Sequence, residues 1–157
     1  MNYWLMKSEP TTYSIEEMRR DRTCIWDGVR NYMARNFLQQ MKVGDFCFFY
    51  HSNTKIPGIV GLVRVSEAHL VDPTQFDEKS PYYDPKATPE SPRWQTVRVE
   101  FVERFPQIIS LAELKNYFDP DELLLVRRGN RLSVMPIAPD IYDRILKLKL
   151  NSPANPW

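Results

Sequence analysis

The sequence predicts an α+β domain, a small and mostly antiparallel β-barrel with short flanking helices. With 157 residues, 43% of them hydrophobic, the chain has the size of one ordinary domain and can bury a single core. Segments typical of strands cluster in mid-chain, and the helical patterns between them are short. Long helices do not alternate with strands, which argues against a doubly wound parallel sheet. We place the domain at residues 1–150 and treat 151–157 as a C-terminal tail.

Each element follows from a local pattern. The segment Tyr3–Lys7 forms the first expected strand. Ser14 and Glu17 have the spacing of a capping box, which predicts a brief helix after Ser14. The apolar spacing after Asn31 predicts a second helix with Asn31 as its N-cap, and Gly44 is placed to end that helix in a left-handed turn.

Three central strands are expected at Phe46–His51, Ile59–Ala68 and Val97–Val102, because these segments are rich in β-branched and aromatic residues. Ser110 begins a second capping box and so predicts another short helix. The remaining expected elements are a short helix opened by Asp119 and Pro120, a turn at Gly129–Asn130, a strand at Leu132–Ile137 and a final helix from Pro139.

Composition and charge exclude several classes of protein. The net charge is +1, so no overall field gathers nucleic acid or an anionic membrane, and any such contact must be local. Apolar runs are far shorter than the ~20 residues of a membrane span, and the N-terminus has no signal-peptide pattern. The isolated Cys24 and Cys47, with His51 and His69, offer no metal-ligand spacing. We therefore expect a cytoplasmic monomer without a metal, cofactor or membrane partner.

The stretch just before the second helix concentrates aromatic, acidic, guanidinium and amide groups around a glycine. Trp26 and Tyr32 can stack on a flat ring, an interaction worth ~1–3 kcal/mol per base in single-strand binders. Asp27 and Asn31 can then bind the polar edge of that ring. Arg30 and the helix N-terminus both favour an anion such as a flanking phosphate. The pattern alone allows an equally weighted alternative in which both aromatics belong to the core and both polar residues serve a turn and a cap.

Two other groups of polar residues are candidates for a site. Lys7, Ser8 and Glu9 at the end of the first strand can form a polar pocket or a solvated strand end, and the pattern alone favours the solvated strand end. The buried strand Phe46–His51 ends in four hydrogen-bonding side chains that point at the barrel rim, namely Tyr50, His51, Ser52 and Asn53. A basic loop at Arg127, Arg128 and Arg131 can contact phosphates or can be a solvated surface.

A proline-rich segment separates two of the central strands. Residues 72–93 contain five prolines with Tyr82 and Tyr83, and the segment is much longer than an ordinary connection of ~4–6 residues. We expect it to act as a lid or as a wall of the site. A protein-interaction module that uses this segment is an open alternative.

Several motifs follow one another along nearly the whole chain: Tyr3–Pro10, Trp26–Tyr32 with Ala34–Asn36, Phe49–Asn53, Gly58–Gly61 and Arg131–Val134. Together they resemble the EVE domain, which is found in many bacterial single-domain proteins. The resemblance implies a PUA-like fold related to the YTH and ASCH domains. It also implies a pocket for a modified base, with 5-methyl- or 5-hydroxymethylcytosine as the expected ligand. By the same resemblance, the residues that line or support the pocket are Trp26, Asn31, Tyr32, Lys7, Ser8, Ser52 and Asn53.

The implied function is recognition of a modified cytosine in nucleic acid. An extruded base would stack on Trp26 or Tyr32 and accept or donate hydrogen bonds at Asp27, Asn31 or Ser52. A buffer anion such as sulfonate, sulfate or phosphate is expected to occupy the same place.

The competing hypothesis is an enzyme, because ASCH relatives include small amidohydrolases that use lysine and glutamate. Lys7 and Glu9 lie two residues apart on a strand and so face the same side, where they can act as base or nucleophile and as acid. This chemistry requires a strongly lowered pKa at Lys7. We favour the binding module.

Overall fold

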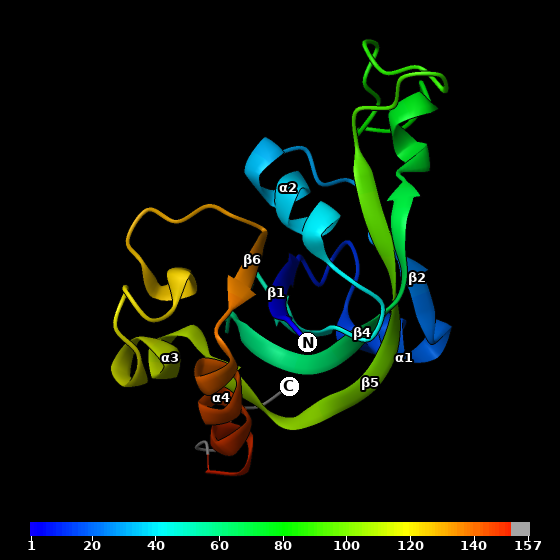
Figure 1. Ribbon diagram of the computed structural model, residues 1–157. Helices are drawn as coiled ribbons and strands as arrows, with labels where there is room; N and C mark the ends of the chain where they lie inside the picture. The colour runs from blue at the N-terminus through cyan, green and yellow to red at the C-terminus, as the bar shows by residue number, and fades with distance from the viewer. Residues whose placement is uncertain (152–157) are drawn as a thin grey trace.

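A single curved sheet forms the centre of the molecule (Figure 1). The computed structural model describes residues 1–151, to which all statements below refer. The sheet has six strands in the order β2-β5-β4-β3-β1-β6, of which β1 and β3 are parallel and all other neighbours antiparallel. The strands are β1 (Tyr3–Ser8), β2 (Thr23–Ile25), β3 (Phe46–His51), β4 (Gly58–Val71), β5 (Gln95–Ser110) and β6 (Val134–Ile137). The predicted α+β class and the mostly antiparallel sheet are confirmed.

Short helices flank the sheet, as predicted. They are α1 (Ile15–Asp21), α2 (Tyr32–Gln40), α3 (Leu111–Tyr117) and α4 (Pro139–Asn151), with 3-10 turns η1 (Pro73–Phe76) and η2 (Leu124–Val126). Ser14 and Ser110 each form a complete capping box. The side chain of Asn31 accepts a hydrogen bond from the Ala34 amide, so it caps α2 as expected.

The predicted barrel is wrong in one respect, because the sheet does not close. The edge strands β2 and β6 are short and do not pair with each other within the described chain. Helix α2 contacts both β5 and β6 and so occupies the gap between the two ends of the sheet. A helix cannot complete the ladder of hydrogen bonds between strands, and the sheet therefore stays open.

The two faces of the sheet carry separate hydrophobic cores. Side chains alternate between the faces along each strand, so Trp4 and Met6 enter one core while Leu5 enters the other. Helices α1 and α2 cover the first face with Ile15, Met18, Ala34 and Leu38. The second face is covered by α3, η2 and α4 with Leu114, Leu125, Ile141, Tyr142 and Ile145.

Strands β4 and β5 extend beyond the rest of the sheet and carry residues 72–94 at their tip (Figure 1). The fully buried Gln75 holds this segment together. Its amide nitrogen donates to the carbonyls of Asp72 (2.7 Å) and Trp94 (2.9 Å). Its amide oxygen accepts from the backbone of Arg93 (2.9 Å) and Trp94 (3.1 Å). The proline-rich segment is therefore an ordered extension of the domain.

Several expected boundaries differ from the structure. Gly44 has a positive φ of 96°, but α2 already ends at Gln40, so this glycine turns the chain into β3. The short helix predicted to open at Asp119 and Pro120 is not an α-helix. This segment of the described chain forms a turn followed by the 3-10 turn η2. The sequence patterns did not predict the strand β2 or the turn η1. Of the predicted tail at 151–157, Asn151 ends α4 and residues 152–157 lie outside the described residues, so the predicted domain boundary at residue 150 stays a prediction.

Candidate functional site

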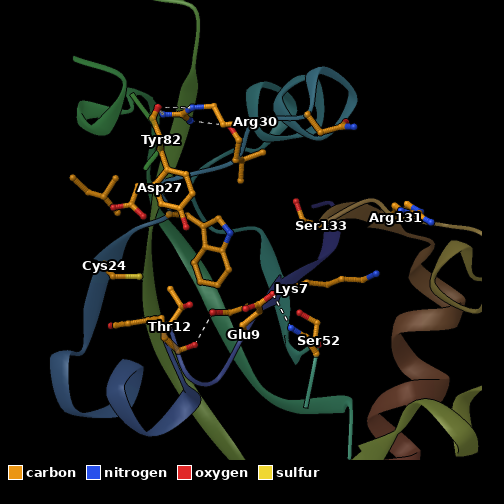
Figure 2. A pocket seen from close by; sticks show the side chains of 18 of the residues that line it. Lys7, Glu9, Thr12, Cys24, Asp27, Arg30, Ser52, Tyr82, Arg131 and Ser133 are labelled. Carbon is orange, nitrogen blue, oxygen red and sulfur yellow. Dashed lines mark hydrogen bonds between the residues drawn. The ribbon is translucent and has the colours of Figure 1, made fainter. Parts of the chain in front are cut away.

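An open pocket of about 1000 Å³ lies where the ends of β1 and β3 meet the loop between β2 and α2 (Figure 2). It is lined by polar, aromatic and charged side chains from widely separated parts of the chain. They are Lys7, Ser8, Glu9, Thr12, Tyr13, Asp21, Cys24, Ile25, Trp26, Asp27, Gly28, Val29, Arg30, Asn31, Ser52, Asn53, Tyr82, Arg131 and Ser133. We call it the main pocket.

The sheet supplies the inner wall of the main pocket. Because β1 and β3 are parallel, their carboxyl ends lie side by side, and the Ser52 amide donates to the Ser8 carbonyl at 3.0 Å. On the other side of β1, the Lys7 amide donates to the Ser133 carbonyl at 2.8 Å. The Asn53 side chain donates to the Glu9 carboxylate at 3.3 Å. Four of the predicted candidates from the two strand ends, Lys7, Ser8, Ser52 and Asn53, are thus brought together at one wall.

Trp26 belongs to both the core and the pocket. Its side chain is only 7% exposed and its ring meets the Phe49 ring edge-on, with 5.4 Å between centroids. Its amide donates to the Val97 carbonyl at 2.9 Å, and its carbonyl accepts a hydrogen bond from the Thr96 hydroxyl. The core and site interpretations of this residue are therefore compatible, since a fixed indole can present part of its surface to a ligand.

Tyr82 supplies a second aromatic surface, from the outer wall of the pocket. Gly28 has a φ of +82°, and a Cβ atom there would lie 2.7 Å from the Tyr82 ring. Only glycine permits both this backbone conformation and this close approach. The segment around Tyr82 was expected to form a lid or wall, but nothing in the sequence singled out this residue against its neighbour Tyr83.

Arg30 holds the outer wall in place, as Figure 2 shows for its bonds to the Tyr82 backbone. Its Nε and Nη2 donate to the Tyr82 carbonyl at 3.0 and 2.7 Å. Its Nη1 donates to the buried Asp72 carboxylate at 3.0 Å, and Nη2 also donates to the Thr74 hydroxyl at 3.0 Å. Since all three guanidinium nitrogens bind protein groups, the structure gives Arg30 a positioning role in place of the expected contact with an anion.

Asp27 and Asn31 lie on the rim of the pocket. Protein atoms around the Asp27 carboxyl displace water and, with the nearby Asp72 carboxylate, raise its pKa above the usual range. The Asn31 side-chain oxygen caps α2, which leaves the Nδ2 group as its donor to a ligand. The rim therefore offers an acceptor and a donor close together in sequence.

Three of the residues predicted to bind the base lie outside the lining of the main pocket. Tyr32 stacks on the Trp94 ring with centroids 5.0 Å apart, and its hydroxyl accepts from Arg93. His51 is buried, accepts a hydrogen bond from the Ile15 amide at 3.1 Å, and has a pKa lowered to about 4 by burial. Tyr50 points to the opposite face of β3, where burial raises its pKa to about 12. His51 thus supports the start of α1.

The arginines of the basic loop line two different pockets. Arg131 lines the main pocket, whereas Arg127 and Arg128 line a second pocket of about 540 Å³. Lys7 lines both pockets, and burial lowers its pKa. We call the second one the basic pocket; it is lined by Lys7, Tyr50, Leu111, Lys115, Leu125, Val126, Arg127, Arg128, Gly129 and Asn130.

Metal sites and membrane-spanning helices were both expected to be absent, and the findings that follow refer to residues 1–151. Among them, no group of histidine, cysteine, aspartate or glutamate side chains has the arrangement of a metal site. None of the described helices is long and apolar enough to cross a membrane.

Comparison with known proteins identifies the family. The model of the EVE domain matches residues 2–148. The chain belongs to the EVE family. Thymocyte nuclear protein 1 of mouse is 42% identical over 171 aligned positions, which cover 98% of this chain and 76% of the mouse protein. The resemblance found in the sequence motifs is thereby confirmed.

Solved structures agree with this EVE assignment. A crystal structure of a Pseudomonas putida protein has a TM-score of 0.91 at 49% identity and covers 94% of this chain and 99% of that one. The crystal structure of human thymocyte nuclear protein 1, in complex with DNA containing 5-methylcytosine, has a TM-score of 0.91 at 40% identity. That match covers 98% of this chain and all of the human chain. The neighbours fit the expected PUA-like fold, with an open sheet in this chain.

Proposed function

We propose that this EVE domain binds nucleic acid and recognises a modified cytosine in its main pocket. The observation that carries the proposal is a pocket with aromatic surfaces and polar rim groups in a chain 40% identical to a protein solved with 5-methylcytosine DNA. The base leaves its stack and enters between the inner wall and Tyr82. A cytoplasmic location and a monomeric state are part of the same proposal.

The rim groups match the polar edge of cytosine. Its exocyclic amine is a donor, for which an aspartate is a suitable acceptor, and Asp27 provides the carboxylate. The Asn31 Nδ2 group can donate to an acceptor of the base, and the Ser52 hydroxyl can do either. Ile25 and Val29 line the same pocket and provide apolar contact for a 5-methyl group.

The free-energy cost of extruding a base can be compared with the gain from contacts in the pocket. Extrusion of a base costs a few kcal/mol, whereas aromatic contact returns ~1–3 kcal/mol and each neutral hydrogen bond ~0.5–1.5 kcal/mol. A methyl group in an apolar surrounding adds ~1–3 kcal/mol, which corresponds to roughly tenfold or more in discrimination. Base contacts therefore provide selectivity, while net affinity requires further contacts to the strand.

The test is a titration followed by intrinsic tryptophan fluorescence. Single-stranded oligonucleotides of one sequence carry cytosine, 5-methylcytosine or 5-hydroxymethylcytosine at the same position. We expect at least about tenfold tighter binding of one modified form than of plain cytosine. Equal affinity for all three would reject the proposal.

The amidohydrolase alternative retains one observation in its favour. Lys7 and Glu9 line the same pocket, and burial lowers the pKa of Lys7 in the direction that a base or nucleophile needs. No ion pair joins the two side chains within residues 1–151. Turnover of an N-acyl cytidine that is lost in Lys7→Ala would favour the enzyme over the binding module.

A further inference from the structure

Within the described chain, the cations around the basic pocket are gathered together without acidic partners. Arg64, Arg98 and Arg144 bind carboxylates of Glu100, Glu67 and Glu122, respectively. By contrast, within residues 1–151 no carboxylate pairs with any of the cationic side chains that line the basic pocket, which are Lys7, Lys115, Arg127 and Arg128. Like charges gathered without acidic partners repel one another, and an anion relieves that repulsion.

Hydrogen bonds hold the loop that carries the arginines of the basic pocket. Asn130 fixes the loop, because its side-chain nitrogen donates to the Leu124 carbonyl at 2.7 Å and its side-chain oxygen accepts from the Leu132 amide at 3.0 Å. The loop thereby presents Arg127 and Arg128 on one side and Arg131 on the other.

Tyr50 adds a neutral donor to the lining of this pocket. A tyrosine hydroxyl carries its proton at neutral pH, and burial raises the pKa of Tyr50 further, to about 12. Within residues 1–151 this hydroxyl has no protein hydrogen-bond partner. The Lys7 ammonium lies 5.8 Å from the centre of the Tyr50 ring. A hydroxyl donor beside several cations, with no carboxylate in the lining, is complementary to a phosphate group.

We propose that the basic pocket binds the phosphate backbone of the strand whose modified base occupies the main pocket. This inference rests on the proposed function. Lys7 belongs to both linings, so the two pockets adjoin at the end of β1, and Arg131 faces the main pocket from the same loop. A strand with its base beside Trp26 continues past Lys7, and its adjacent phosphates bind Arg127, Arg128 and Lys115.

The test compares ligands with and without a backbone. Binding of 5-methylcytidine, and of single-stranded oligonucleotides with plain or 5-methylated cytosine, is measured for the intact chain and for Lys115→Ala, Arg127→Ala and Arg128→Ala. Lys42→Ala removes an exposed cation that precedes β3, at the opposite end of the parallel strands, and serves as the matched control.

Each basic-pocket variant should weaken oligonucleotide binding about three- to tenfold and lower the salt slope by about 0.7. The ratio of affinities for methylated and plain strands, and the binding of 5-methylcytidine, should stay constant. Lys42→Ala should behave as the parent.

Unchanged oligonucleotide affinity and salt slope in all three variants would overturn the inference, even where the parent still prefers methylated strands. A parent that shows no such preference would reject the proposed function instead. Weakened binding of the free nucleoside in the variants would also overturn the inference, because the basic pocket would then act on the base.

Discussion

The two walls of the main pocket are built in different ways. The inner wall consists of the ends of β1 and β3 with Trp26, and it is held by sheet hydrogen bonds and by the core. The outer wall, residues 72–94 with Tyr82, meets the loop between β2 and α2 mainly through Arg30 and Asp72. Damage to the inner wall should therefore unfold the domain, whereas damage to the outer wall should remove binding from a domain that remains folded.

The largest expected effect comes from Arg30→Ala. The change removes every bond from the guanidinium to the outer wall and leaves the Asp72 carboxylate, only 2% exposed, without its cation. We expect a loss of about 3 kcal/mol in the free energy of unfolding, at the low end for a broken buried pair because the Gly28 and Thr74 amides still donate to Asp72. Binding of modified oligonucleotides should also be lost.

Urea unfolding and fluorescence titration measure the two quantities for Arg30→Ala. Arg144→Ala is the control, because its ion pair with Glu122 is exposed and should contribute less than about 1 kcal/mol. If Arg30→Ala bound oligonucleotides as tightly as the parent, the outer wall would have no part in recognition.

The inner wall should respond to pH through His51. Its pKa in the folded protein, about 4, lies below the ordinary value of 6.5, so the unfolded chain binds the proton first as the pH falls. The contribution of neutral His51 to the free energy of unfolding is fully present above pH 6.5. It declines as the pH falls from 6.5 to about 4, by about 3 kcal/mol in total. Urea unfolding at several pH values should show this decline reduced in His51→Gln. The exposed His69 offers the control His69→Gln, which should retain it.

Gly28→Ala should separate the walls without removing a charge. The new Cβ atom would meet the Tyr82 ring, so we expect at least about tenfold weaker binding of modified oligonucleotides. Gly44→Ala imposes a similar backbone strain, about 1–2 kcal/mol, at a position with open space around it. Both variants should lose similar stability in thermal unfolding, but only Gly28→Ala should lose affinity. Equal affinities in the two variants would contradict the assigned contact.

Tyr82→Ala removes only the aromatic surface of the outer wall. The expected loss is ~1–3 kcal/mol of binding free energy, about five- to 150-fold in Kd for a modified oligonucleotide. Tyr83→Ala is the matched control, because the neighbouring ring does not line the pocket. A larger loss of affinity in Tyr83→Ala than in Tyr82→Ala would reverse the assignment of the two tyrosines.

The smallest effect on binding is expected for Tyr32→Ala. Tyr32 stacks on Trp94 outside the pocket lining, so its removal should lower stability by about 1 kcal/mol and change affinity about twofold or less. The titration used for Tyr82→Ala measures this as well. A loss of affinity like that of Tyr82→Ala would restore Tyr32 as a base-stacking residue.

The inner wall could largely be predicted from sequence, because local patterns determine it. The strand Phe46–His51 follows from residues a few positions apart, as does the cap at Asn31 on the rim of the pocket. The same holds for the caps at Ser14 and Ser110 elsewhere in the fold. The polar end of the strand Phe46–His51 indicated Ser52 as a site residue, and the family resemblance added Ser8. The parallel pairing of β1 and β3 places these two serines side by side.

The outer wall could not be predicted in the same detail, because long-range contacts decide it. The contact between Gly28 and Tyr82 depends on the β4–β5 extension, which carries Tyr82 to the pocket. No local sequence pattern at either residue predicts that contact. The role of Arg30 depends on Asp72 and Tyr82 in the same way, so an isolated arginine before a helix suggested a phosphate contact. The open sheet has a similar origin, because α2 fills its gap through tertiary packing alone.

The position of β1 between β3 and β6 has a consequence for synthesis on the ribosome. β1 precedes the other five strands along the chain, yet one of its neighbours in the sheet, β6, begins only at Val134. Arg131 and Ser133 of the main pocket also arrive only then. A nascent chain that has not yet emerged as far as Val134 has an incomplete sheet and an incomplete ligand site, so binding requires that this last strand has been made.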